Sequence, residues 1–507
     1  MKVCFALLTV LFATVRVTAK TIRVPANQPT IQAAINAAVD GDTVLVSSGT
    51  YTENIDLAGK NIVVASSKGP AVTIIDGNSQ ASVVQFVSGE TTKSILRGFT
   101  VRNGYASVSN SSGYGGGIYI RSSSPTITGN IISRNQADSG GGGIAVFSAS
   151  PQIMNNKITN NSQSPNSTLG LGGAGVLIYG PSSPHLISNV ISGNSFIANG
   201  GGVTVESATA PVLMNNSITN NSGIDGGGIW VENTQFASII QNVITGNFGR
   251  DGGGIMLFPL SSTETALLVN NTVAGNSASS GSAVFIFGTD TGVRFYNNLF
   301  IGLTGFDAVA CNGTGGSVFF NTDAFEPASG GFAGTCVNQS GTNGNVSVDP
   351  KFVSPTSNNY KLKGGSPAID LGTNTAPNLP ATDFAKNPRT VDGNGGLTAI
   401  VDMGAYEFIP VVLAPKSLTF GLHSVGSTTT KIVKLTNAQN KALSISSFSL
   451  PTGYSVTGCG PSVAAFTTCS LTVAFHPFSA GTFKGTLRVN DSAGNSPQLI
   501  GLSGTAQ

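Results

Sequence analysis

The sequence contains few charged residues, and this scarcity excludes most helical proteins. Asp, Glu, Lys and Arg make up 9% of the 507 residues, against about a quarter in an ordinary soluble protein. Glycine is abundant instead, with 66 copies, which is roughly twice its usual share. Few charges and many glycines suit short strands joined by tight turns, so an all-β protein is predicted.

A run of basic residues is also missing, and the formal net charge is only +2. Binding to nucleic acid is therefore not predicted, because it relies on clustered Lys and Arg. No later segment is apolar enough to serve as a transmembrane segment. Residues 1–19 have the pattern of a secretory signal peptide, with Lys2, an apolar stretch and the small-residue end VTA at 17–19. A secreted or cell-surface protein is expected.

Only five cysteines occur, and Cys4 lies inside the predicted signal peptide. The other four form two local pairs, Cys311 with Cys336 and Cys459 with Cys469. An even number of cysteines in an exported chain favours two disulfide bonds. Metal ligation is disfavoured, because neither pair has close cysteine spacing or a histidine nearby.

A glycine-rich motif repeats along the chain, and a branched residue ends each copy. The motif is GGGI, GGGV or a looser variant, and successive copies are 26 to 32 residues apart. The branched residues are Ile118, Ile144, Val176, Val203, Ile229, Ile255 and Val284. A period of about 20–50 residues indicates a solenoid or a propeller. Each unit holds two or three very short strands, which favours a parallel β-helix with one coil per repeat.

Asparagines recur in step with the glycines. One series holds Asn130, Asn156, Asn189, Asn216, Asn242, Asn271 and Asn298, and another asparagine follows each of the first six by five residues. Equivalent residues of a parallel β-helix stack about 4.8 Å apart. Each series is therefore predicted to form an internal ladder of amide hydrogen bonds. An amphipathic helix within residues 29–42 is placed to cover the N-terminal end of the stack.

These features make the chain similar to a known group of proteins. Residues 20–345 resemble the right-handed parallel β-helix proteins of the pectin-lyase-like superfamily, with an N-terminal cap. SPAIDLG (366–372) and VDMGAYEF (401–408) resemble the closing segment of bacterial exported β-helix proteins, which would span 346–410. Alternating strands in 411–507 predict a β-sandwich, and CSLTVAFHPFSAG resembles immunoglobulin-like modules of bacterial surface proteins. The expected fold is an all-β right-handed parallel β-helix (solenoid) with an N-terminal capping helix, followed by an immunoglobulin-like β-sandwich.

The resemblance implies cleavage of pectin-like polysaccharides, but the residues of polygalacturonases are missing. Those enzymes need a Gly-His-Gly and an Arg-x-Lys element, and this chain has only one Asn-Thr-Asp, at 321–323. No motif closely matches the calcium site of pectate lyases. His185 lies beside Pro184 in a variable part of the repeat and is expected at the surface. A catalytic or binding site must therefore be predicted from which residues become neighbours when the coils stack.

The closing segment contains a cluster of acidic residues. Its acids are Asp370, Asp383, Asp392, Asp402 and Glu407, and Arg389 lies among them. They are expected to form charge pairs that seal the last coil.

Stacking brings acidic residues together in the middle of the repeat. Asp225 and Asp251, four residues before the branched position, fall on adjacent coils, and so do Glu206 and Glu232, three residues after it. These four are the candidate catalytic residues. The separation of stacked carboxyl groups suits a retaining glycosidase pair, and their oxygens could hold Ca²⁺. Asp225 and Asp251 could instead cap the amides of the glycine corners.

An aromatic stripe follows the same outer face. A strand whose Ile229 points inward must direct Trp230 and Glu232 outward. The aromatic residues of this face are Tyr119, Phe147, Tyr179, Trp230, Phe258, Phe285 and Phe287. Such a stripe marks either a binding groove or a surface that loops or another module cover.

Two functions follow from these patterns. Sugars stack their C–H faces on aromatic rings, and carboxylates accept their hydroxyl groups. The first function is therefore binding, with cleavage by a lyase or glycoside hydrolase mechanism as a further step, of an extracellular polysaccharide or cell-surface glycan. The second is a non-catalytic surface or adhesion protein whose stack is a spacer. A monomer is expected in both cases.

Overall fold

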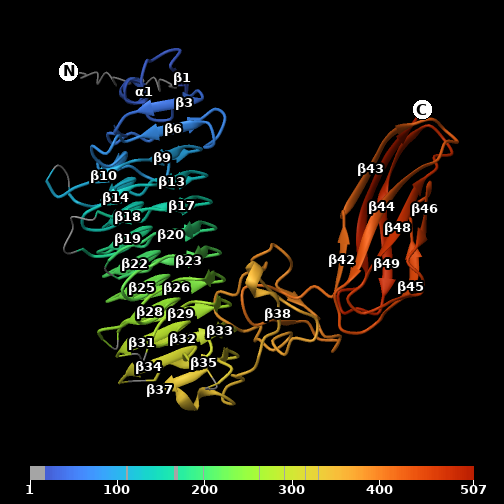
Figure 1. The fold of residues 1–507 in the computed structure, drawn as a ribbon. Coiled ribbons are helices and arrows are strands. Elements are labelled where there is room, and N and C mark those ends of the chain that lie inside the picture. Colours follow the sequence, from blue (N-terminus) through green and yellow to red (C-terminus); the bar gives the residue numbers. More distant parts are fainter. Residues whose placement is uncertain are drawn as a thin grey trace, which may run out of the picture.

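A computed structural model describes residues 18–109, 112–164, 170–197, 199–261, 263–289, 292–314, 316–328 and 331–507. The predicted signal peptide lies almost entirely outside these residues and stays a prediction. The described chain forms a parallel β-helix followed by a β-sandwich, which confirms the predicted fold class. Figure 1 shows the coils stacked in sequence order from β1 to β37, with the sandwich beside them.

Three parallel sheets form the walls of the β-helix. Each coil from β2 onward contributes one strand to each sheet, and β1 adds a further strand to sheet A. Sheet A contains β1 (Thr21–Val24), β2 (Thr43–Val46), β5 (Val63–Ser66), β8 (Ile95–Arg97), β12 (Thr126–Thr128), β16 (Gln152–Met154), β20 (His185–Ile187), β23 (Val212–Met214), β26 (Phe236–Ile240), β29 (Thr265–Val269), β32 (Val293–Tyr296) and β35 (Val318–Phe320). Sheet B contains β3 (Gly49–Thr52), β6 (Thr73–Asp76), β9 (Thr100–Arg102), β13 (Ile131–Ser133), β17 (Lys157–Thr159), β21 (Val190–Ser192), β24 (Ser217–Thr219), β27 (Val243–Thr245), β30 (Thr272–Ala274), β33 (Leu299–Ile301) and β36 (Asp323–Phe325). Sheet C contains β4 (Ile55–Asp56), β7 (Val84–Phe86), β11 (Ile118–Arg121), β15 (Ile144–Phe147), β19 (Val176–Tyr179), β22 (Val203–Glu206), β25 (Ile229–Glu232), β28 (Ile255–Phe258), β31 (Val284–Gly288), β34 (Val309–Gly313) and β37 (Phe332–Gly334).

The interior of the solenoid is a continuous apolar core. The seven branched residues that end the glycine motif face each other in register on sheet C and have no exposed surface. The glycines before them form the tight corner that leads into each of these strands of sheet C. Gly226 has φ of +60°, and an added Cβ would lie 2.6 Å from the carbonyl oxygen of Ile229. Any larger residue at this corner would be strained.

Both asparagine ladders form as predicted. Asn216 is typical of the first series, because its backbone N–H and its Nδ2 both donate to Oδ1 of Asn242, at 2.9 and 3.0 Å. Its Nδ2 also donates to the carbonyl oxygen of Leu186 at 2.8 Å, and its Oδ1 accepts from Asn189. Asn221 and Asn247 repeat this pattern in the second series. Each buried amide is thus satisfied by the neighbouring coils.

The N-terminal end is covered by the predicted helix, which is shorter than the amphipathic stretch that suggested it. Helix α1 (Ile31–Ala37) begins at Thr30, whose side chain accepts from the N–H of Ala33 at 3.1 Å. The carboxylate of Glu53 accepts two further free amides of the first turn, from Ile31 and Gln32. The helix buries its apolar side in the end of the core and lies beside β1 (Figure 1).

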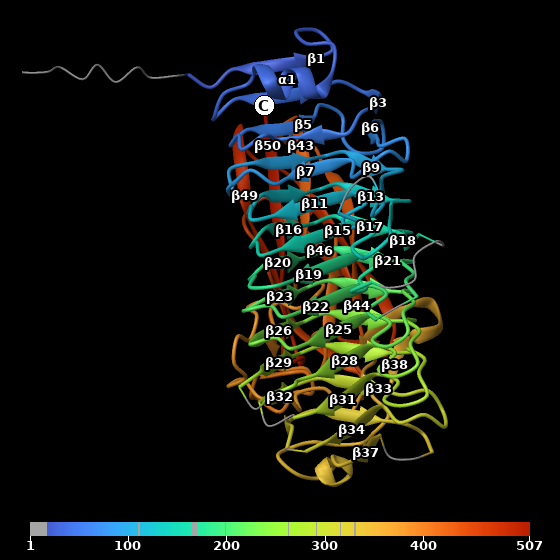
Figure 2. The same ribbon diagram turned by 90° about the vertical axis from the view of Figure 1, so that its left-hand side faces the viewer.

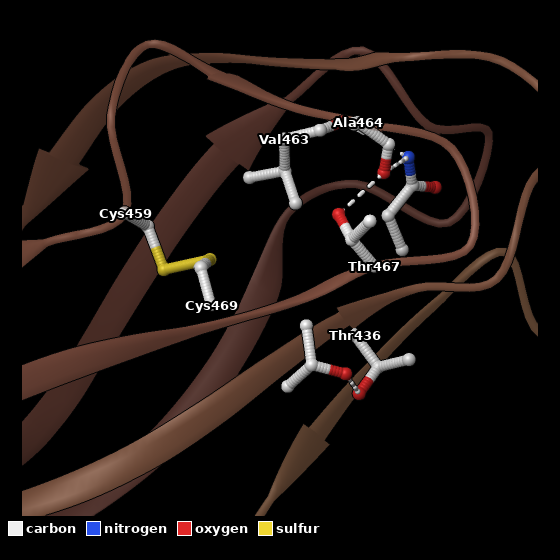
Figure 3. The surroundings of a disulfide bond; sticks show 8 residues. Thr436, Cys459, Val463, Ala464, Thr467 and Cys469 are labelled. Atoms are coloured by element: carbon white, nitrogen blue, oxygen red, sulfur yellow. Dashed lines mark hydrogen bonds between the residues drawn. A yellow bond between two sulfur atoms is a disulfide. The ribbon is translucent and has the colours of Figure 1, made fainter.

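Both predicted disulfide bonds are present. Cys311 of β34 is bonded to Cys336, which precedes the 3-10 helix η1 (Val337–Gln339) at the C-terminal end of the stack. Cys459 is bonded to Cys469 within the sandwich (Figure 3). The first bond ties β34 to the turn that follows β37, the last strand of sheet C.

The closing segment differs from the expectation that it seals the last coil, because it lies along the side of the solenoid. It contains β38 (Phe352–Ser354), η2 (Pro355–Ser357), β39 (Asn359–Leu362), β40 (Thr390–Val391) and β41 (Ile400–Val401). Four amide side chains at the corner between sheets A and B donate to its backbone carbonyl oxygens. They are Gln241 to Thr382 (2.8 Å), Asn270 to Asp402 (3.0 Å), Asn297 to Thr373 (3.1 Å) and Asn321 to Leu371 (3.0 Å). Each immediately precedes the inner-ladder position of its coil, so this outer series holds the closing segment across four coils.

The charged residues of the closing segment are buried together. Arg389 is fully buried, donates to the carbonyl oxygens of Asp402 and Gly404, and lies 4.0 Å from the carboxylate of Glu407. Burial raises the pKa of the Asp402 carboxyl, and burial together with the nearby Asp402 raises the pKa of Glu407. Most of these carboxyl oxygens accept backbone N–H groups, so the network serves structure rather than a ligand.

Asp323, at the start of β36, is a buried carboxyl outside the closing segment. Its Oδ1 accepts from the N–H of Val348 at 3.0 Å, and Oδ2 has no hydrogen-bond partner among the described residues. Burial raises the pKa of Asp323 from 3.8 to about 8. Thr322 and Asp323 of the Asn-Thr-Asp stretch are thus buried, and the first residues of the closing segment contact Asp323.

Residues 411–507 form a sandwich of two sheets around their own apolar core. One sheet contains β42 (Val411–Ala414), β44 (Thr429–Asn437), β48 (Thr468–Phe475) and β46 (Tyr454–Gly458). The other contains β43 (Ser417–His423), β50 (Gln498–Ala506), β49 (Gly481–Asp491), β45 (Leu443–Ser449) and β47 (Ser462–Val463). No helix within the described residues is long and apolar enough to cross a membrane.

Replacing Asn216 by alanine should destabilise the protein by about 1–3 kcal/mol, because it leaves the buried N–H of Asn189 without this partner and removes the hydrogen bond to the Leu186 carbonyl. Urea denaturation followed by circular dichroism measures the loss. Asn36→Ala, at an exposed position of α1, is the matched control and should change the midpoint little. Equal midpoints for the two variants would show that the inner ladder does not stabilise the stack.

Stability should fall as pH rises between about 4 and about 8 because of Asp323. Its folded-state pKa is above the ordinary value, so the folded protein keeps a proton that the unfolded chain releases. The resulting penalty is at most about 1.4 kcal/mol for each pH unit. Asp323→Asn should remove this part of the pH dependence, whereas Asp40→Asn, at an exposed carboxylate, should not. Thermal melts of both variants and the parent across this range provide the measurement, and parallel curves for Asp323→Asn and the parent would contradict it.

Candidate functional site

The outer face of sheet C carries the candidate residues in the predicted register. Thr204, Trp230 and Met256 are direct neighbours on β22, β25 and β28, and Glu206 is paired with Glu232. Figure 2 shows these strands one above the other along the middle of the stack. The Asp225–Asp251 pair is adjacent as well, because the N–H of Asp251 donates to Oδ1 of Asp225 at 3.2 Å.

Trp230 points outward, since it packs in a cluster separate from the interior core, with Met256, Phe285 and Ala310. The indole is nevertheless only 5% exposed. At a strand spacing of about 4.8 Å, large side chains on successive coils touch and cover each other. Trp230 therefore forms the floor of a hollow and does not offer a free ring face. Phe287, two coils further on, is 40% exposed.

The aromatic residues fall into two groups. Tyr114, Tyr119 and Tyr179 surround Phe147, with ring centroids 4.8, 5.9 and 5.6 Å from it. In the other group, Phe258 lies 6.0 Å from Trp230 and 5.2 Å from Phe287, and Phe285 stacks on Phe287 at 6.4 Å. Glu206 and Glu232 stand between the two groups, so the stripe is interrupted by acids.

The two glutamates are half-buried, and their environment favours the protonated form. Burial, followed by the charge of Glu232, raises the pKa of Glu206. Burial also raises the pKa of Glu232, and the nearby Glu264 adds to the increase. The indole N–H of Trp230 opposes it by donating to Oε2 of Glu232 at 3.2 Å. The only tryptophan of the chain is thus hydrogen-bonded to a candidate acid.

The two aspartates share one guanidinium group. Arg250 donates to Oδ2 of Asp225 at 2.6 Å and to Oδ2 of Asp251 at 3.3 Å. Burial raises the pKa of Asp225 even though Arg250 lowers it. Asp225 accepts a corner amide, as the structural alternative predicted, but that amide belongs to Asp251 and not to a glycine.

A cavity of about 300 Å³ opens beside this triad. It is lined by Asp225, Trp230, Arg250, Asp251, Met256, Phe258, Phe285, Phe287 and Asn312. The structure thus brings together both candidate aspartates and the Trp230 group. Glu206, Glu232, Tyr119, Phe147 and Tyr179 lie on the same face but do not line the cavity. Asn312 was not predicted as a site residue. The only sequence feature that could have pointed to it is its position directly after Cys311.

A larger hollow of about 560 Å³ lies at the neighbouring corner, between sheets B and C. Sequence reasoning missed it. Its lining includes Ile197, Ile224, Phe248 and Phe306, and Arg250 lines both hollows. The sequence feature that could have revealed this hollow is Phe248, which occupies a position where the adjacent coils have Ser222 and Ser277.

Two other predictions concern ligands. His185 begins β20 on sheet A and is partly exposed, away from sheet C. Over the part of the chain that the structure describes, no group of three or more His, Cys, Asp or Glu side chains is placed to hold a metal ion.

Comparison with known proteins supports the fold. A family model described as a right handed beta helix region matches residues 60–191 and 166–300, so the stack is a right-handed parallel β-helix. A model described as Abnormal spindle-like microcephaly-assoc'd, ASPM-SPD-2-Hydin, or ASH, matches residues 410–499, which form the sandwich. No curated protein matches the chain.

Several solved structures are distantly similar. A protein of unknown function from Porphyromonas gingivalis W83 is 13% identical, with a TM-score of 0.18; the match covers 19% of this chain and 46% of that one, less than half its length. A mannuronic acid specific polysaccharide family 6 lyase from human gut microbiota is 14% identical, with a TM-score of 0.28, and covers 67% of this chain and 93% of its own. The ASH/PapD-like domain of human CEP192 is 15% identical, with a TM-score of 0.17, and covers 19% and 85%.

Because Trp230 is the only tryptophan, its fluorescence should report the protonation of Glu232. The emission is expected to titrate with a midpoint above the ordinary pKa of a glutamate, since burial raises the pKa of Glu232. Glu232→Gln should abolish the titration. Asp251→Asn, a nearby acid that contacts Arg250 and not the indole, should retain it. A titration that persists in Glu232→Gln would show that the indole senses another group.

Proposed function

We propose that the protein is exported and binds an extracellular polysaccharide along the outer face of sheet C. The observation that supports this most is the cavity of about 300 Å³, which has an aromatic floor and a charged wall. Its volume is at the lower end of the range of about 300–1,000 Å³ for ligand sites. A sugar ring has apolar faces and hydroxyl edges, and this hollow offers partners for both.

The floor is formed by Trp230, Met256, Phe258 and Phe285, and Phe287 rises beside it. Phe287 and the partly exposed Phe258 can cover the C–H face of a sugar above this buried floor. Asp225 and Asp251 hold the guanidinium of Arg250 on the opposite wall, where the three groups can exchange hydrogen bonds with hydroxyl groups. The disulfide bonds are consistent with an oxidising, extracellular setting. In this proposal the monomer acts alone, and the sandwich is a spacer or attachment module.

Cleavage is a second candidate, and the stacking of Glu206 on Glu232 is what favours it. A raised carboxyl pKa is needed in a general acid, and both glutamates have one. However, the glutamates do not line the cavity, so a bound chain would have to extend toward β22 to reach them. Binding is therefore the function that the geometry supports better, and an adhesion protein whose stack is only a spacer remains the alternative.

Phe287→Ala should weaken glycan binding about tenfold, equivalent to about 1.4 kcal/mol, because it removes the most exposed ring of the cavity. Affinity electrophoresis through gels that contain galactomannan, xylan, β-glucan, polygalacturonate or alginate measures the change. Phe236→Ala is the matched control, since Phe236 is 43% exposed but lies on sheet A.

Retardation by no polysaccharide, or equal retardation of both variants and the parent, would contradict binding at this face and favour the adhesion alternative. The same polysaccharides are assayed for new reducing ends and unsaturated products. Product release that survives both Glu206→Gln and Glu232→Gln would remove these glutamates from any cleavage mechanism.

A further inference from the structure

The charges around the cavity restrict which glycan it can accept. Asp225 and Asp251 line it, and Glu206 and Glu232 lie on the same face, whereas Arg250 is the single basic residue of the lining. The lining itself holds two carboxyl groups against one guanidinium, so it is acidic overall. A polymer with a carboxylate on every sugar would meet repulsion along its length.

Arg250 offsets this repulsion only in part, because its charge is already shared by the two aspartates. Its Nη2 is 2.6 Å from Oδ2 of Asp225, and its Nε is 3.3 Å from Oδ2 of Asp251. A uronic acid that reached the remaining N–H groups of Arg250 would at the same time approach both aspartate carboxylates. A bridging cation meets a similar obstacle, because Oδ1 of Asp225 already accepts the N–H of Asp251. Hydroxyl groups, in contrast, can bond to the rim of this triad without breaking it.

The larger hollow at the corner extends the site past Arg250. Its lining includes Ser277, Ser279 and several apolar side chains, and no acidic residue lines it. Phe248 is 57% exposed, and Phe306, Ile197 and Ile224 are exposed as well. Soluble proteins seldom leave such a group of apolar side chains uncovered without a partner. Two phenylalanine rings with serine hydroxyls nearby suit the alternating apolar faces and hydroxyl edges of further sugar units.

We infer that the ligand is an uncharged polysaccharide, and that it runs from the cavity beside Trp230 across Arg250 into the corner hollow around Phe248. This inference rests on the proposed function and specifies its substrate class. Arg250, which is 66% exposed, then forms the ridge between two subsites of one binding trough. The corner hollow is the subsite that a long chain reaches and a short one does not.

The test uses the full mature chain with neutral oligosaccharides, such as gluco-, xylo- and manno-oligosaccharides, and with oligogalacturonates of matched length. Binding is followed by the fluorescence of Trp230. Neutral chains should bind, with an affinity that changes less than about twofold between about 10 mM and about 1 M salt, because only charge–charge contacts are screened over this range. Phe248→Ala should weaken binding of a hexasaccharide about tenfold and leave a disaccharide unchanged. Phe236→Ala serves again as the control.

Salt-sensitive binding of oligogalacturonates in preference to neutral chains would overturn the inference and leave the proposed function intact. An unchanged hexasaccharide affinity in Phe248→Ala would remove the corner hollow from the site. If no oligosaccharide of either class binds, the proposed function fails and the inference fails with it.

Discussion

A polar amide buried inside a stack of coils has to find its partners in the coil above and the coil below, and the whole solenoid depends on this requirement. Asn216 illustrates it, since its side chain contacts Leu186 and Asn189 on one side and Asn242 on the other. A shift of one residue in any coil would leave several buried groups unpaired. The ladders therefore set the register, and the register decides which side chains meet on the outer faces.

The same register has opposite effects on the outer face of sheet C. Aromatic side chains on successive coils cover one another, which stabilises the group around Trp230 but removes the indole from solvent. Burial, together with the charge of Glu232 on the next coil, raises the pKa of Glu206 and favours its protonated form. Arg250 relieves this repulsion at Asp225 and Asp251, and in doing so it builds the wall of the cavity. The site is thus a consequence of stacking unlike groups on neighbouring strands.

The sequence was sufficient to predict the coils, both ladders, the capping helix, the disulfide bonds and the pairing of Glu206 with Glu232. These features depend on the types of residues and on their spacing along the chain, and both can be read directly from the sequence. The burial of Trp230 could not be predicted, because it depends on how Met256, Phe258 and Phe285 fill the space around it. The contacts of Arg250 were missed for a similar reason, since a corner residue can point to either side. Phe248 was visible as a departure from serine at one position of the repeat.

The position of the closing segment is the instructive error. Its acids were expected to cap an open end, where unpaired strand edges need cover. The end is covered instead by the chain around Cys336, and the closing segment lies over the corner between sheets A and B. The residues that hold it, Gln241, Asn270 and Asn297, look like ordinary turn residues in the sequence. Yet they belong to the coils that carry β25 through β31 or directly adjoin them. The coils that carry the cavity on sheet C are therefore held by the closing segment at the corner between sheets A and B. Separating these coils would break the outer series of amide hydrogen bonds.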